Sequence, residues 1–218
     1  MSTIEEGLLY ILSTVGALLP IVNPLSAVGL VVGITQELTE AERRQQIARA
    51  CIYMFGILTA FLVAGGVIMS FFGISIPGLR IAGGLIVGYI GFRMLFPDTS
   101  GISRQERDEA AHKPDVSFTP LAMPMLSGPG SIGVVVGIAS TAQDGDHVVL
   151  NYALVAMGIA VTALISYVVL RAATRLNQVL GATGMNAIAR LMGFLLVCIG
   201  VQFVINGIGD VVQRNFQA

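Results

Sequence analysis

The sequence predicts an all-α membrane protein with six transmembrane helices, which form two inverted three-helix repeats whose first and fourth spans are broken. Three observations predict this fold. Apolar segments long enough to cross a bilayer fill most of the chain, a segment with prolines and glycines occurs twice, and basic residues gather in alternate connections. Because 55% of the residues are hydrophobic and 11% are charged, the composition leaves no room for a sizeable soluble domain, and residues 1–218 are expected to form one integral membrane domain.

The six spans are predicted from charge-free length. Crossing about 30 Å of hydrocarbon takes roughly 20 predominantly apolar residues in a helix. Three runs without any charged residue, 7–36, 50–79 and 116–143, exceed this length. Three further spans are expected at about 76–96, 148–170 and 186–208.

The connections between these spans predict the orientation in the membrane. Cytoplasmic connections are enriched in Lys and Arg. The first, third and fifth connections carry eight basic residues, Arg43, Arg44, Arg49, Arg104, Arg107, Lys113, Arg171 and Arg175, whereas the opposite side carries only Arg214 outside the helices. We therefore expect these connections in the cytoplasm and both termini outside. The longest, residues 97–117, is polar and flanked by prolines, and it is interpreted as a linker, with a regulatory docking site as the alternative.

Two pairs of similar segments indicate an internal duplication. Residues 20–34, PIVNPLSAVGLVVGI, share six of fifteen positions with residues 124–138, PMLSGPGSIGVVVGI. The pattern R-x-x-G-x-L-x-V begins at Arg80 in the third span and again at Arg190 in the sixth. Repeats with an odd number of spans point in opposite directions across the membrane, so residues 7–96 and 118–208 are expected to form two inverted repeats. The alternative is chance similarity among helices rich in glycine and valine.

The duplicated segment predicts where a small molecule binds. The first span should kink near Asn23-Pro24 and the fourth should unwind at residues 128–130, because proline and the residue before it disfavour a continuous helix. The amides that begin a half-helix attract an anionic group, and the carbonyls that end one suit an ammonium group or a cation, so two antiparallel breaks suit a zwitterion. The predicted substrate-binding residues are Pro20, Asn23, Pro24, Ser26, Pro124, Ser127, Gly128, Pro129, Gly130 and Ser131. The alternative is that the prolines only shape helix packing.

Other residues within the spans are interpreted by position. Arg80 and Arg190 are predicted to clamp the repeats together or to gate each mouth, and Arg93 to extend its guanidinium to the cytoplasmic surface. Glycines four residues apart are expected to allow close helix contact, at Gly29 and Gly33, Gly84 and Gly88, and Gly133 and Gly137.

Acidic residues and histidines are missing from the predicted hydrocarbon core. All thirteen Asp and Glu residues lie outside it, and both histidines lie in connections. The sequence therefore predicts no proton relay and no protease or other catalytic site in the membrane, and the protein is not expected to be an enzyme. No cofactor or metal is expected, although a coupling Na⁺ held by carbonyl and hydroxyl oxygens would suit such a core better than a proton carrier.

Three long segments carry a resemblance to a known family. PLAMPMLSGPG at 120–130, FGISIPGLRIAGGLIVGYIGFRMLFP at 72–97 and RLMGFLLVCIGVQFVINGI at 190–208 resemble the MarC family of bacterial inner-membrane proteins, also described as six-span neutral amino acid transporters. The resemblance implies a multi-pass protein of the inner membrane, here with periplasmic termini, and transport of small neutral amino acids such as glycine and alanine. Carried onto this chain, the site would involve Asn23, Pro24, Ser127, Gly128, Pro129 and Gly130.

Three functions follow from these observations. The leading hypothesis is a secondary transporter of a small neutral amino acid or similar zwitterion by alternating access. Efflux of amphipathic drugs is the second, which is weakened because a wide aromatic-lined cavity is hard to build without Trp and with 7% aromatic residues. A non-transporting membrane scaffold or accessory protein is the third. The expected partners are the lipid bilayer and a small-molecule substrate, without nucleic acid, and a homo-oligomer stays open.

Overall fold

The computed structural model describes residues 3–96, 115–143 and 147–216, and within these ranges all regular secondary structure is helical. Residues 97–114, most of the predicted linker, lie outside the described residues. The helices in chain order are α1 (Thr3–Val22), α2 (Pro24–Ile34), α3 (Glu40–Phe71), α4 (Ile76–Leu95), η1 (Ser117–Leu126), α6 (Pro129–Gln143), α7 (Val148–Arg171) and α8 (Ala173–Phe216).

The described helices supply four to six candidate membrane spans. Four of the described helices are long and apolar enough to cross a membrane: α3, α4, α7 and the segment Thr183–Gln213 of α8. Two bent pairs, α1 with α2 and η1 with α6, bring the number to six when each pair counts as one span. The predicted fold class is therefore confirmed as an all-helical membrane protein.

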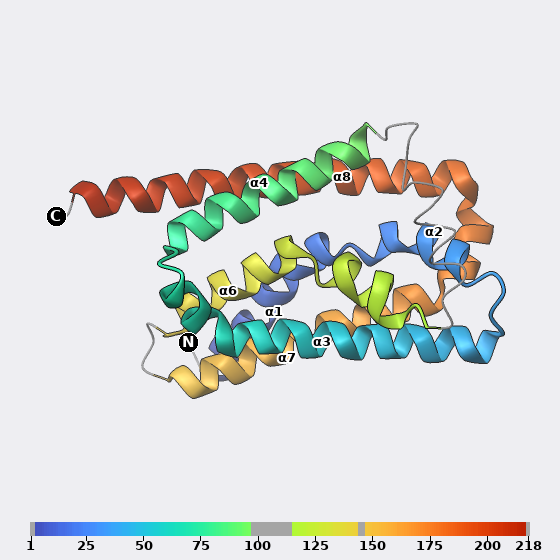
Figure 1. Cartoon of the computed structure of the whole chain (residues 1–218), viewed down its shortest axis with the longest axis horizontal. Helices are drawn as coiled ribbons and strands as arrows, with labels where there is room; N and C mark the ends of the chain where they lie inside the picture. Colours follow the sequence, from blue (N-terminus) through green and yellow to red (C-terminus); the bar gives the residue numbers. More distant parts are fainter. Residues whose placement is uncertain (1–2, 97–114, 144–146, 217–218) are drawn as a thin grey trace.

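The helices form three layers, with the broken pairs in the middle (Figure 1). One outer layer consists of α4 beside the long segment of α8, and the other of α3 beside α7. Both termini lie at the same end of the molecule. This arrangement surrounds the least regular backbone with continuous helices, as expected because irregular backbone at membrane depth must be buried in protein or line a cavity.

Packing between the two halves of the chain is reciprocal. Helix α1 packs on α7 while η1 packs on α3, and α2 packs on α8 while α6 packs on α4. The remaining large contacts join α3 to α7 and α4 to α8, and α3 also packs on α6, with the smaller contact of α7 on α2 as its counterpart. Exchanging the first four helices with the last four, in order, leaves this set of contacts unchanged.

Local sequence signals set the ends of the regular helices. Thr39 and Glu42 form a capping box at the start of α3, in which each side chain accepts a hydrogen bond from the other residue's backbone N–H. Gly73, with a φ of 64°, lies in the turn after α3. Ser75 then caps α4 by accepting a hydrogen bond from the N–H of Gly78 at 3.2 Å.

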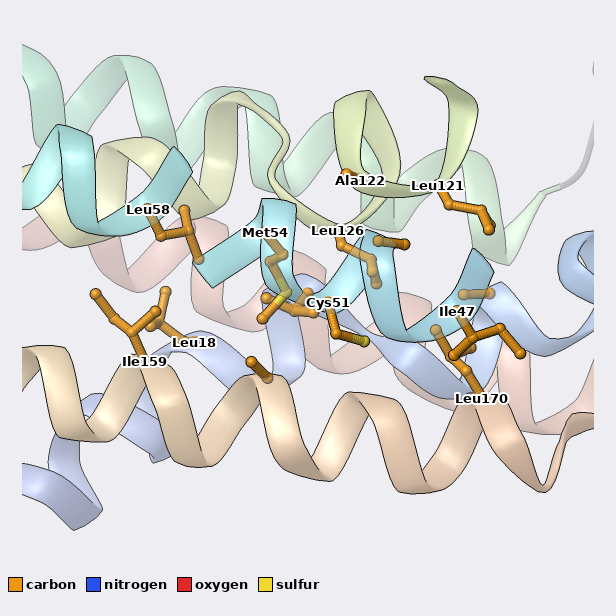
Figure 2. Close-up of a cluster of buried hydrophobic side chains, with 14 of the residues drawn as sticks. Leu18, Ile47, Cys51, Met54, Leu58, Leu121, Ala122, Leu126, Ile159 and Leu170 are labelled. Carbon is orange, nitrogen blue, oxygen red and sulfur yellow. The ribbon is translucent and has the colours of Figure 1, made fainter. Parts of the chain in front are cut away.

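An apolar core joins the α3 and α7 layer to the broken pairs (Figure 2). Met54 and Leu58 of α3, Leu18 of α1, Leu126 of η1 and Ile159 of α7 are completely buried within it. In lipid this core gains mainly van der Waals contact, because the surrounding tails are as apolar as the side chains. Large apolar side chains also cover the outside, such as Phe71 at 82% and Val149 at 85% exposure, where they meet the bilayer.

Glycines set the spacing between α4 and α8. A Cβ on Gly200 would lie 2.5 Å from the carbonyl oxygen of Gly84, and a Cβ on Gly193 would lie 2.8 Å from that of Gly91. The expected packing role is therefore confirmed for Gly84. It is wrong for Gly29 and Gly33, which are exposed and where an added Cβ would meet no atom within 4 Å.

Candidate functional site

The first break lies where it was predicted, at Asn23-Pro24. Helix α1 ends at Val22 and α2 begins at Pro24, at an angle of 43°. Asn23 joins them in the left-handed conformation, with φ 44° and ψ 61°, which asparagine tolerates better than most residues. Its side-chain oxygen accepts a hydrogen bond from the N–H of Ser26 at 3.3 Å, and the Ser26 hydroxyl donates to the Asn23 carbonyl at 3.0 Å. The polar groups of this break thus partly satisfy one another.

The second break is longer than predicted. Helix η1 ends at Leu126 and α6 begins at Pro129, with a bend of 60° between them. The predicted break at residues 128–130 is therefore confirmed at Gly128, whereas Pro129 and Gly130 lie in the first turn of α6. The backbone also leaves helical geometry at Thr119 and Met123. Each of these residues precedes a proline, whose ring disfavours the helical conformation of the residue before it. A Cβ on Gly128 would lie 2.7 Å from the Pro124 carbonyl oxygen, so the bend requires glycine there.

The two breaks line one cavity of about 790 Å³. Seven of the ten predicted substrate-binding residues line it: Asn23, Ser26, Pro124, Gly128, Pro129, Gly130 and Ser131. Helices α4 and α8 complete its wall, and the remaining lining residues are Ile21, Val22, Ile90, Arg93, Met94, Met125, Asn186, Ala189, Arg190 and Leu196. Segments about a hundred residues apart in sequence therefore meet at one space.

Three predicted substrate-binding residues do not line this cavity. Pro24 is buried, and Pro20 is half-buried in α1. Ser127 is completely buried and lines a separate, mainly apolar hollow of about 370 Å³ beside α4. Within the described part of the chain, its hydroxyl has no hydrogen-bond partner. At the 60° bend between η1 and α6, Ser127 thus faces the smaller hollow, whereas its neighbours Gly128 and Ser131 line the large cavity.

The two arginines predicted as clamps or gates have different surroundings. Arg80, near the start of α4, forms an ion pair with Asp210 of α8. It also lines a smaller hollow of about 220 Å³ between α4, α6 and α8. Arg190 lines the large cavity instead, and no ion pair with another described residue is found for it. Arg80 and Arg190 therefore face different spaces.

Sequence reasoning missed several cavity residues. Arg93, interpreted as a surface-seeking arginine, lines the cavity from the last turn of α4. Its neighbour Met94 contacts the first break, because the Asn23 Nδ2 donates to the Met94 sulfur at 3.8 Å. Asn186 lines the cavity from α8 after an interruption at Gly181, where φ is 60°. A signal for Arg93 was present, since a charged residue within a span is a functional candidate.

The cavity lining is partly apolar and carries two positive charges. It combines apolar side chains with a few polar groups, as ligand sites usually do. Its described residues include two guanidinium groups, from Arg93 and Arg190, and neither a carboxylate nor an aromatic ring. Across the described ranges, no group of three or more His, Cys, Asp or Glu residues is arranged to hold a metal ion.

A polar network fixes the chain where it enters η1. Asp115 forms an ion pair with Arg49 of α3 at 3.4 Å and accepts hydrogen bonds from the hydroxyl and the N–H of Ser117. The Ser117 hydroxyl, then its N–H, and then Arg49 lower the pKa of the Asp115 carboxyl below its ordinary value. The Gln46 side chain accepts from the N–H of Val116 at 2.7 Å. This network attaches the start of the broken span to α3.

Comparison with known proteins confirms the family resemblance. The family described as MarC family integral membrane protein matches residues 8–212. The inner membrane protein MarC of Escherichia coli O157:H7 is 43% identical over 206 residues, which cover 91% of this chain and 93% of that protein. The protein of the same name from Salmonella typhimurium is 44% identical over 204 residues, covering 90% and 92%. No solved structure matches the chain.

Proposed function

The chain belongs to the MarC family of integral membrane proteins, and we propose that it is an inner-membrane secondary transporter of small neutral amino acids or similar small zwitterions. The observation that carries this proposal is the convergence of two helix breaks on one cavity of about 790 Å³. Broken helices free backbone groups that a substrate or ion can satisfy, and transporters of several folds bind substrate at such breaks.

Alternating access is supported by the reciprocal packing of the two halves. We infer that residues 7–96 and 118–208 form inverted repeats, because most contacts between helices have a counterpart when the halves are exchanged and the paired helices run in opposite directions (Figure 1). Such a protein has two related conformations in which the halves exchange roles. In this structure the two spaces differ, since the cavity at Arg190 is about 790 Å³ and the hollow at Arg80 about 220 Å³.

The cavity is proposed to open toward the cytoplasm. It is lined at one end by Arg93, in the last turn of α4, and by Asn186, near the start of the long segment of α8. The basic connections 35–49 and 171–175 lie at this end of the molecule, opposite the two termini (Figure 1). The excess of arginine in these connections favours the cytoplasm here and periplasmic termini.

One observation favours the alternative of drug efflux. The cavity volume of about 790 Å³ lies within the range of about 300–1,000 Å³ typical of pockets for drug-sized ligands. The described lining contains no Phe, Tyr or Trp, however, and so offers no aromatic surface to an amphipathic drug. A non-transporting membrane scaffold is less favoured, because a cavity lies between the two breaks.

Uptake by proteoliposomes tests the proposal. Purified protein, Asn23→Ala and Gly128→Leu are each reconstituted, and uptake of labelled glycine and alanine is measured with and without a Na⁺ gradient. We expect uptake by the unchanged protein and at least a tenfold loss in Gly128→Leu, because a side chain there meets the Pro124 carbonyl.

Gly56→Leu is the matched control, since Gly56 is exposed on α3 and a Cβ added there would have no atoms within 4 Å. It should transport like the unchanged protein, and all variants must elute as single species in detergent. No uptake above empty vesicles, or equal uptake by the Gly56→Leu and Gly128→Leu variants, would refute the proposal. Equal rates with and without Na⁺ would exclude sodium coupling only.

A further inference from the structure

The large cavity is lined by two positive charges on exposed side chains. Arg93 and Arg190 both line it, and no acidic residue does so among the described lining residues. Arginines within spans are rare and normally pair with an opposite charge or a backbone carbonyl. The ion pair between Arg80 and Asp210, at the other end of α4, shows the usual solution in this same protein.

Arg93 and Arg190 are attached at nearly the same level along α4 and α8. Gly91 of α4 and Gly193 of α8 touch each other, since a Cβ on Gly91 would lie 2.6 Å from the Gly193 carbonyl oxygen. The helices run in opposite directions (Figure 1). Arg93 is two residues beyond Gly91, about 3 Å along the axis, and Arg190 is three residues before Gly193, about 4.5 Å in the same direction. Two like charges at one level favour an anion between them.

The half-helices offer an anion only part of their first-turn amides. Both α2 and α6 begin with a proline, Pro24 and Pro129, which has no N–H to donate. The N–H of Ser26 already donates to the Asn23 side chain, at 3.3 Å. In α6 the first turn still offers the N–H groups of Gly130 and Ser131, which line the cavity, and the arginines add planar forks that suit a carboxylate.

We propose that Arg93 and Arg190 bind the carboxylate of the transported molecule, and thus that the substrate class is restricted to small molecules with a free carboxylate. That the bound molecule is a transported substrate rests on the proposed transport function. The same charges would also suit the phosphate of a lipid headgroup, which is the competing source of an anion.

Ligand binding to purified protein in detergent provides the first test. The midpoint of thermal unfolding is measured with glycine, acetate, glycinamide, inorganic phosphate and phosphatidylglycerol, because a ligand that binds the folded state raises the midpoint. We expect glycine and acetate to raise it and glycinamide, which lacks the carboxylate, to have no effect at the same concentration. Equal effects of glycine and glycinamide, or an effect of phosphate or phosphatidylglycerol only, would overturn the proposal.

Substitutions then assign the effect to the two arginines. Arg93→Gln and Arg190→Gln should each raise the half-saturating glycine concentration about 10- to 100-fold, and Arg190→Lys should fall between them and the unchanged protein. Arg175→Gln is the control, since it removes an exposed charge at the same end of the molecule outside the cavity lining and should leave glycine binding unchanged. If Arg190→Gln binds glycine normally, the assignment is wrong. Normal binding without uptake in vesicles would refute the transport function while leaving the carboxylate site intact.

Discussion

Single glycines determine how closely α4 and α8 approach each other. A Cβ on Gly200 would lie 2.5 Å from the Gly84 carbonyl oxygen and 2.6 Å from the backbone nitrogen of Gly88. Backbone atoms cannot move away as a flexible side chain can, so even a methyl group must separate the helices. This contact matters for function because the same two helices contribute Arg93 and Arg190 to the cavity wall.

The first prediction at this scale concerns Gly200→Ala. We expect it to lower the free energy of unfolding by about 1–3 kcal/mol, the usual range for overpacking, even though alanine is the better helix former by about 1 kcal/mol. The thermal unfolding midpoint in detergent measures the effect. Gly56→Ala is the matched control, because a Cβ at that position would have no atoms within 4 Å, and its midpoint should stay equal or rise. A Gly200→Ala midpoint equal to that of Gly56→Ala would contradict the close contact.

At the scale of elements, the bend between α1 and α2 depends on one residue. Asn23 combines a left-handed backbone, with φ 44°, with a side-chain cap on the N–H of Ser26. Glycine adopts this conformation freely but lacks the cap, whereas alanine lacks both advantages. Substitutions at this one position therefore separate the conformational requirement from the hydrogen bond.

We predict that Asn23→Gly is more stable than Asn23→Ala by about 1 kcal/mol, the approximate penalty of a left-handed conformation for a residue with a Cβ. Replacing an N-cap asparagine by glycine should itself lose only a few tenths of a kcal/mol. Thermal unfolding in detergent measures the order of the variants, and glycine uptake should fall in the same order if the bend positions the cavity wall. An alanine variant as stable as the glycine variant would show that the left-handed backbone is not required.

The sequence allowed the broken elements to be predicted because proline acts locally. Pro24 begins α2 as expected, whereas Pro129 begins α6 although unwinding was predicted through residue 130. The distortions at Thr119 and Met123 follow from the same rule applied to the residues before Pro120 and Pro124. The site was harder to predict because its composition depends on tertiary packing. Ser127 was assigned to the site by its position beside Gly128, but the bend places it against a different hollow.

Tertiary contact also decides the role of small residues and charges. Gly84 has a partner in Gly200, whereas Gly29 has the same four-residue spacing to another glycine and no neighbour within 4 Å of where its Cβ would lie. Arg80 and Arg190 begin the same sequence pattern, but one is paired with Asp210 and the other lines the cavity. Neither distinction can be obtained from spacing within one helix, because each depends on the opposing helix.

For the whole molecule, the difference between its two spaces is the central feature. The cavity that Arg190 lines is more than three times as large as the hollow that Arg80 lines, at about 790 and 220 Å³. If the halves are inverted repeats, the alternate conformation should enlarge the hollow and reduce the cavity. A substrate can shift this equilibrium only if it binds the two conformations with different affinity.

Cysteine labelling can therefore detect the exchange. In a background with Cys51→Ala and Cys198→Ser, a single cysteine is introduced as Asn186→Cys in the large cavity or Gly137→Cys in the smaller hollow. We expect glycine to change the two rates of reaction with a water-soluble maleimide in opposite directions, each about severalfold, because a population shift opens one space while it closes the other. Gly56→Cys, on the exposed face of α3, should react at a rate that glycine does not alter. Rates that fall together at both cavity positions would indicate simple coverage by the ligand, and would contradict alternating access.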